Sequence, residues 1–136
     1  MLELKLRRIP FTSESENRLR TLKARTGLDR NYICRMGFCL SLEEAGIPPV
    51  VAAKSLEGRE IDRYTLLGQY GTAFIALLIV WMSRNASSAG SVDLDSWFVA
   101  HMNRGVEIIA ARIRTLADMA SLFPGENGSG CTPTGE

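Results

Sequence analysis

Hydrophobic and charged residues alternate at the start of the chain, where Leu2, Leu4 and Leu6 are separated by single charged residues. A period of two is typical of a short, half-buried β-strand, and Pro10 marks its end. No other segment has this pattern, and a strand without a partner is not stable. We therefore expect residues 2–8 to pair with a strand from a second copy of the protein, or to form an extended arm packed on helices.

The pattern changes to a helical period after this segment. Ser13 and Glu16 match a capping box, and Gly27 is a typical C-terminal stop, so a first helix is predicted over residues 13–26. Leu19 and Leu22 fall on one narrow apolar stripe of this helix, which is expected to pack on the rest of the domain.

A second helix is predicted from a cap at Asp29 to about Glu44. Apolar and small residues cover nearly its whole circumference, which indicates burial on most sides. In a chain of this size such burial usually needs a neighbouring subunit. Residues 46–62 are expected to be a connector with local packing.

The third predicted helix, Tyr64 to Met82, contains an uninterrupted apolar run from Ala73 onward. A membrane span is the alternative, but the apolar stretch reaches only the lower end of the roughly 20 residues that a span needs, and Gln69 and Tyr70 lie within it. We favour a central helix of an oligomeric bundle and expect no membrane partner.

A fourth helix, capped by Asp93 or Asp95, is predicted to extend to about Leu122 after a loop rich in small residues. The remaining residues, 124–136, have the composition of a disordered tail. The predicted fold is therefore mainly α: one domain over residues 1–123, with four helices, an N-terminal extended or β arm, a ribbon-helix-helix-like N-terminal half and an oligomeric helical core.

Composition adds a local charge bias to this picture. The 136 residues have 16 Lys and Arg against 15 Asp and Glu, but residues 1–35 hold nine basic and four acidic residues. The N-terminus lacks the apolar run of a secretory signal, and the three cysteines fit no disulfide framework. We expect a cytoplasmic protein.

Catalytic chemistry is poorly represented in the sequence. Cys34 and Cys39 point in different directions on one helix and are expected to be small buried thiols, and His101, the one histidine, is expected to make a structural hydrogen bond. Asp93 and Asp95 are explained by helix capping. No phosphate-binding glycine loop, nucleophile elbow or zinc motif is present, so we predict no enzyme activity, no catalytic residue, no metal site and no cofactor.

Nucleic-acid binding is the function that the basic N-terminal segment favours. Several Lys and Arg side chains on one surface can neutralise phosphates, and repetition in an oligomer would strengthen the field. An ordinary solvated surface is the alternative. Arg35 lies among apolar positions and is expected to need an anion, either a carboxylate or a phosphate. The predicted DNA-binding residues are Arg18, Arg20, Lys23, Arg25 and Arg30.

Five short motifs resemble a known family. They are Leu22-Lys23-Ala24-Arg25-Thr26-Gly27; Asn31 with Cys34-Arg35-x-x-Phe38-Cys39-Leu40-Ser41-Leu42; Gly58-x-Glu60-Ile61; Gly68; and His101-x-x-Arg104-Gly105. Their order and spacing, from about Leu4 to Ile109, resemble the DndE family of bacterial DNA sulfur-modification proteins.

The resemblance implies a non-enzymatic subunit of the phosphorothioation system, in which a non-bridging phosphate oxygen of DNA is replaced by sulfur. It further implies a helical homotetramer that binds duplex DNA, favours nicked DNA and works beside other subunits of the system. Lys23 and Arg25 match the basic motif of the family, whereas Cys34, Cys39, His101 and Arg104 match positions that we interpret as structural. The alternatives are a ribbon-helix-helix regulator that reads a DNA sequence, and a scaffold for the other modification subunits.

Overall fold

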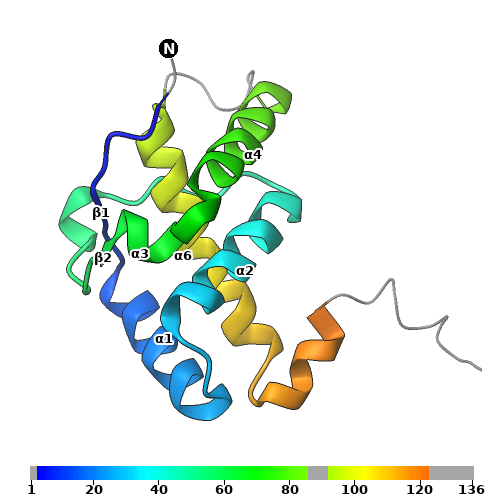
Figure 1. Cartoon of the computed structure of the whole chain (residues 1–136). Coiled ribbons are helices and arrows are strands. Elements are labelled where there is room, and N and C mark those ends of the chain that lie inside the picture. The colour runs from blue at the N-terminus through cyan, green and yellow to red at the C-terminus, as the bar shows by residue number, and fades with distance from the viewer. Residues whose placement is uncertain (1–2, 86–91, 123–136) are drawn as a thin grey trace, which may run out of the picture.

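Two long helices cross at the centre of the fold, α2 (Arg30–Glu43) and α6 (Leu94–Arg112) (Figure 1). The computed structural model describes residues 3–85 and 92–122. Gly37 of α2 and Gly105 of α6 meet at the crossing, where a Cβ added to Gly37 would lie 2.7 Å from the Gly105 backbone. Only residues without a side chain allow the two backbones to approach this closely. This contact positions α2 and α6 relative to each other.

Helix α1 (Ser13–Thr26) has the boundaries that the sequence predicts. It packs on α6, and Leu19 and Leu22 of its apolar stripe are buried as expected. The predicted capping box is wrong in detail. Thr12, one residue earlier, is the N-cap and accepts a hydrogen bond from the Ser15 amide at 3.0 Å. The Glu16 carboxylate instead accepts from the backbone amide of Arg59, so it ties α1 to the connector rather than to its own first turn.

The N-terminal arm pairs within its own chain. Only Arg8–Ile9 forms a strand, β1, and it is antiparallel to β2 (Ile61–Asp62), with Arg8 opposite Asp62. The expected partner strand from a second copy is therefore wrong, because β2 is too short to show an alternating pattern in the sequence. The alternative of an arm packed on helices is confirmed by Leu4, which is 4% exposed.

The third predicted helix is interrupted. It consists of α3 (Arg63–Leu67), the 3-10 turn η2 (Gly68–Tyr70) and α4 (Gly71–Arg84). Gly68 ends α3 with a φ of 58°, in the left-handed region, and the Arg35 guanidinium lies where a Cβ would be. By length and composition alone the stretch 63–84 could cross a membrane, but α4 has 14 residues, fewer than the roughly 20 that a span needs.

The fourth predicted helix is shorter than expected. Asp93 caps α6 as predicted and accepts from the Ser96 amide, but α6 ends at Arg112 because Ile113 is extended. A short 3-10 helix follows, η3 (Leu116–Leu122), and the Asp118 carboxylate accepts from the Arg114 and Thr115 amides before it. The predicted tail, residues 124–136, lies outside the described residues.

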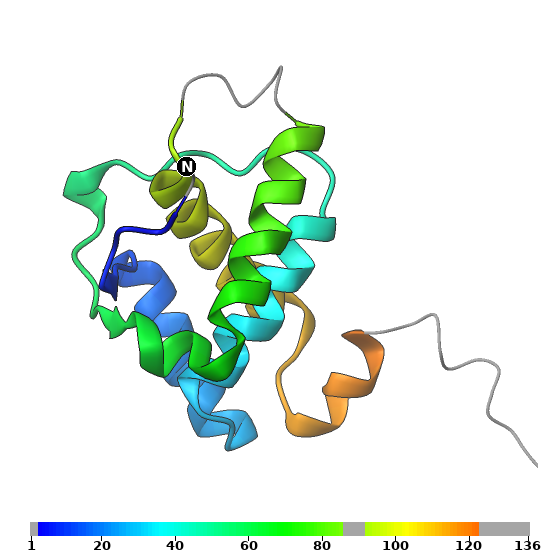
Figure 2. The ribbon, with the colours of Figure 1, turned by 45° about the horizontal axis from the view of Figure 1, so that its top comes forward.

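Helix α4 is apolar around its circumference but is buried on one side only. Phe74, Leu78 and Trp81 pack on the core, whereas Leu77 and Val80 are 47% and 46% exposed. The connector between α2 and β2, which includes the 3-10 turn η1 (Ala53–Ser55), crosses α6 on the side opposite α4, so it does not cover α4 (Figures 1 and 2). Within the part of the chain that is described, α4 therefore leaves an apolar face without a partner.

Candidate nucleic-acid interface

The basic residues of α1 lie on two flanks of the helix, on either side of its buried stripe. Arg18 and Arg25 are two turns apart and both line a pocket beside the C-terminal half of α6. Arg20 and Lys23 lie on the other flank, where they face Glu16 and the start of α2. The helical period alone already places each pair on its own side of the buried stripe, and the structure confirms that the two pairs lie on separate surfaces.

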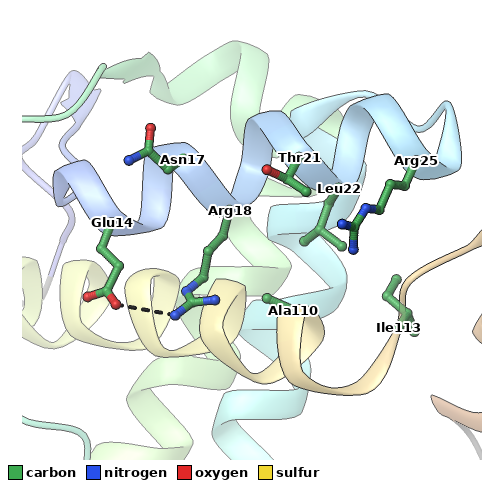
Figure 3. Close-up of a pocket in the computed structure, with 8 residues that line it drawn as sticks. All are labelled: Glu14, Asn17, Arg18, Thr21, Leu22, Arg25, Ala110 and Ile113. Carbon is green, nitrogen blue, oxygen red and sulfur yellow. Dashed lines mark hydrogen bonds and ion pairs between the residues drawn. The ribbon is translucent and has the colours of Figure 1, made fainter.

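The first flank borders a pocket of about 420 Å³ between α1 and the end of α6 (Figure 3). Arg18 reaches across it, and its guanidinium lies 2.7 Å from the Glu107 carboxylate and 3.2 Å from that of Glu14. Arg25 lies at the far end near Ile113, and no described carboxylate is within ion-pair distance of it. Arg25 is therefore the available cation of this flank.

Glu107 has an unusual environment at this pocket. Burial raises the pKa of its carboxyl above the ordinary value, and the Arg18 guanidinium opposes part of that rise. Arg18 thus favours the charged form of this carboxyl, against the effect of burial. A phosphate that attracted Arg18 would have to compete with this contact.

The second flank is joined to the connector and to the start of α2. Arg20 pairs with Glu16 at 3.1 Å, and Lys23 faces Asp29 at 3.8 Å. The Arg59 amide and the Arg20 guanidinium lower the pKa of Glu16, and Arg30 lies close enough to contribute. Arg30 itself has no ion pair with a described residue, so it is the available cation of this flank.

Arg35 differs from the expectation that it needs an anion. Its Nε donates to the Leu66 carbonyl at 2.7 Å, and its guanidinium packs over the rings of Tyr32 and Tyr70. Carbonyl oxygens at the end of α3 and two aromatic faces therefore take the place of the expected carboxylate or phosphate. The wheel of one helix could not show this, because the partners lie 30 residues further along the chain.

The motif residues Ser41, His101 and Arg104 form one buried network. Arg104 donates from Nε to the Ser41 hydroxyl at 2.8 Å and from its terminal nitrogens to the carbonyls of Ser41 and Gly46. The Ser41 hydroxyl is also hydrogen-bonded to His101 Nδ1, at 2.8 Å. Burial lowers the pKa of His101 to about 3. The expected structural role of His101 is confirmed.

The two cysteines of α2 have different environments. Cys34 is buried, and burial raises the pKa of its thiol to about 12, so it is an unreactive core residue. Cys39 is exposed, and the prediction that both thiols are buried is wrong for it. Within residues 3–85 and 92–122, no group of three His, Cys, Asp or Glu side chains is placed to hold a metal ion.

Comparisons with known proteins agree with the motifs. The model of the family described as DNA sulphur modification protein DndE matches residues 8–116. The chain belongs to the DndE family. A crystal structure of DndE from Escherichia coli B7A, involved in DNA phosphorothioation modification, is similar, with 26% identity and a TM-score of 0.60 over 80% of this chain and 98% of that one.

A crystal structure of the DndE G21/24K mutant has the same fold, with 23% identity and a TM-score of 0.57 over 80% of this chain and 99% of that one. A search of curated proteins found no match. These similarities confirm the mainly helical fold of the DndE family, with a short N-terminal sheet, and link the family to DNA phosphorothioation.

Proposed function

We propose that the protein is a non-enzymatic DNA-binding subunit of the bacterial phosphorothioation system, acting in the cytoplasm. Membership of the DndE family supplies the biological process. The observation that supports binding is the placement of Arg25 and Arg30, one on each flank of α1, whose guanidinium groups have no ion pair with a described carboxylate. Phosphate oxygens are the natural ligands of such groups.

The basic residues that form ion pairs contribute to the same two flanks. The side chains of Arg18, Arg20 and Lys23 are 43%, 60% and 54% exposed, and of their carboxylate partners Glu14 and Asp29 are exposed while Glu107 and Glu16 are partly buried. An exposed ion pair contributes only about 0–1 kcal/mol, so a DNA phosphate can displace or share it. The two flanks would follow the backbone on either side of α1.

Assembly as a homotetramer would multiply this surface. The exposed apolar face of α4, with Leu77 and Val80, supports self-association, since a soluble chain rarely exposes such residues together. Sedimentation equilibrium tests it: the wild type should be tetrameric, and Val80→Glu should reduce the mass. A monomeric wild type would contradict the assembly.

A preference for nicked duplex follows from the cost of deforming DNA. A nick lowers the stiffness of the duplex, so subunits on both sides of the break could engage their flanks at a lower bending cost. Competition between intact and nicked duplexes of equal length tests this part alone. Equal competition would remove nick preference and leave duplex binding standing.

The test of DNA binding is a titration of intact duplex at about 50 and 200 mM salt. Lys23→Ala with Arg25→Ala should weaken binding and make the salt dependence shallower, since each lost phosphate contact reduces the slope by about one. Lys54→Ala with Arg84→Ala removes the same charge from η1 and from the end of α4, and is the matched control.

Loss of affinity in both double variants would contradict a specific role for α1. Unchanged affinity in the Lys23 and Arg25 variant, together with failed assembly with the other modification subunits, would favour the scaffold.

The ribbon-helix-helix alternative is weakened by β1, which has two residues and is paired with β2 of the same chain. Protection of one DNA sequence in a footprint would restore it.

A further inference from the structure

Aromatic residues divide into two groups by exposure. Every described Phe and Trp is at most 8% exposed, whereas the three tyrosines, the full number in the sequence, are 49–62% exposed. They lie on neighbouring elements: Tyr32 in the first turn of α2, Tyr64 in the first turn of α3 and Tyr70 in η2. We call these three residues the tyrosine surface.

The tyrosine surface is held together by α2 and α3. Asn31 and Arg35 of α2 both donate to the Thr65 carbonyl of α3, each at 3.4 Å, and Arg35 also donates to Leu66. The Arg35 guanidinium lies 5.3 Å from the centre of the Tyr32 ring and 5.8 Å from that of Tyr70. Two exposed rings are thus fixed on one guanidinium, so a planar ligand could stack on them at a reduced entropic cost.

The third tyrosine repeats the arrangement. The Arg63 guanidinium lies 5.1 Å from the centre of the Tyr64 ring and donates to its hydroxyl, while its other nitrogen donates to the Leu4 carbonyl of the N-terminal arm. The nearby carboxylate, Asp62, accepts from the Tyr64 and Thr65 amides as the N-cap of α3. Each exposed ring therefore has an arginine against it.

The charges of this surface favour an anion with flat groups. Arg30, Arg35 and Arg63 have no ion pair with a described carboxylate, and Arg30 also borders the Arg20 flank of α1 through Glu16. An apolar protein partner would compensate none of these three positive charges, because the acceptors of Arg35 and Arg63 are neutral carbonyl and hydroxyl oxygens. Bases that stack on aromatic rings, joined by phosphates that face arginines, match both properties at once.

We propose that the tyrosine surface binds unpaired nucleotides of DNA, with bases stacked on Tyr32, Tyr64 and Tyr70 and phosphates facing Arg30 and Arg63. This inference rests on the proposed function, in that α1 and the tyrosine surface would bind one DNA molecule. The α1 flanks would hold the duplex, and the tyrosine surface would hold a strand end where bases separate. Aromatic stacking is nearly indifferent to base identity, so no sequence preference is expected.

The experiment compares two double variants on three probes. Tyr32→Leu with Tyr70→Leu removes the rings, and Tyr32→Phe with Tyr70→Phe keeps them without the hydroxyls. The probes are single-stranded oligothymidylate, an intact duplex, and a duplex with an unpaired thymidylate flap. The Leu variant should lose about tenfold or more in affinity for oligothymidylate and the flap and bind the intact duplex as the wild type does, whereas the Phe variant should bind all three like the wild type.

A photocrosslink gives a second readout. Oligothymidylate that contains 5-iodouracil should crosslink the wild type at the tyrosine surface, as mapped by mass spectrometry; crosslinks confined to other residues would overturn the inference. Equal affinity of wild type and Leu variant for oligothymidylate would overturn it as well, as would a change of oligomeric mass in the Leu variant, which would show that a second copy covers the rings. In each case the proposed function still holds if the intact duplex is bound as before. If the wild type itself does not bind intact duplex, the proposed function is wrong.

Discussion

Arginines of the same chain have opposite roles in two regions, the crossing of α2 and α6 and the surface of α1. At the crossing, Arg104 donates to the buried Ser41 hydroxyl, to the Ser41 carbonyl and to the carbonyl of Gly46, which lies at the surface. On α1, Arg18 faces carboxylates on exposed side chains, and Arg25 faces none that is described. The difference lies in the rigidity of the partners rather than in the residue type.

This comparison separates stability from binding. A guanidinium that donates to a buried hydroxyl, as Arg104 does to Ser41, cannot be released to a ligand without leaving that oxygen short of a donor. A guanidinium paired with a mobile surface carboxylate exchanges partners at little cost. Substitutions at the crossing should therefore change the free energy of unfolding and leave DNA binding intact, and substitutions on α1 should do the reverse.

The largest effect is expected from Gly105→Ala. The added methyl group would overlap the backbone of Gly37 and Phe38, which cannot move aside without separating α2 from α6. Overpacking of this kind costs about 3 kcal/mol of unfolding free energy. Urea denaturation measures it.

Gly71→Ala is the control for this prediction. Gly71 is helical, and the nearest atom to an added Cβ is a Leu67 side-chain carbon at 4.0 Å. The substitution should be neutral or stabilise by up to about 1 kcal/mol, since alanine favours the helix. Equal losses of unfolding free energy in both variants would show that the backbones of α2 and α6 are not too close at the crossing to accept a methyl group.

Removal of the Arg104 side chain should have the next largest effect. Arg104→Ala removes the donor to the buried Ser41 hydroxyl, together with the hydrogen bonds to the Ser41 and Gly46 carbonyls, and should cost about 2–3 kcal/mol of unfolding free energy. Arg112 lies on the same helix as Arg104 and is the control: Arg112→Ala breaks an exposed ion pair with Glu44, at the end of α2, and should cost under about 1 kcal/mol.

DNA affinity decides whether this contrast holds. Both variants should bind duplex like the wild type at temperatures where they are folded. Weaker binding by folded Arg104→Ala would place that arginine in the interface and contradict the division between the two regions.

Lowering the pH should reveal the contribution of His101 to the free energy of unfolding. Its pKa is about 3 in the folded protein and near the ordinary 6.5 in the unfolded chain, so the unfolded state gains a proton first as the pH falls. Stability is complete above about pH 6.5 and declines below it, with a limiting slope of about 1.4 kcal/mol per pH unit from this group.

His101→Asn isolates this contribution, since the amide group can still form a hydrogen bond with Ser41 while no group titrates. Urea denaturation at about pH 7, 6 and 5 should give a steeper loss for the wild type than for the variant. Parallel losses would show that His101 titrates normally and lies in a more open site than the structure has.

Local signals explain which parts of the fold were predictable. The boundaries of α1 depend on the Thr12 cap and on Gly27, and α2 begins directly after Asp29 as predicted, although the Asp29 side chain makes no capping hydrogen bond. The interruption at Gly68 depends on Arg35, a residue of another helix, and β2 exists only because β1 lies beside it. Such tertiary causes leave no periodic pattern in the sequence.

The candidate site shows the same limit. The residues of α1 and their two flanks follow from the helical wheel, but the contacts Arg18–Glu107 and Glu16–Arg59 join distant segments and could not be predicted. The tyrosine surface was missed as well, although the sequence contains only three tyrosines. Their exposure beside arginines becomes visible only when α2 and α3 are placed together.

The smallest effect sharpens the comparison from the side of α1. Glu107→Gln removes the carboxylate closest to Arg18, leaves the Glu14 contact, and should tighten duplex binding by about 0.5 kcal/mol, roughly twofold, at low salt. Glu44→Gln also removes a carboxylate that faces an arginine, but at the end of α2, and should leave affinity unchanged if α1 is the interface. Equal gains in both variants would assign the effect to net charge alone, and a loss in Glu107→Gln would mean that Glu107 holds Arg18 in its binding position. The direction of this change thus decides whether the carboxylate competes with DNA or positions the guanidinium for it.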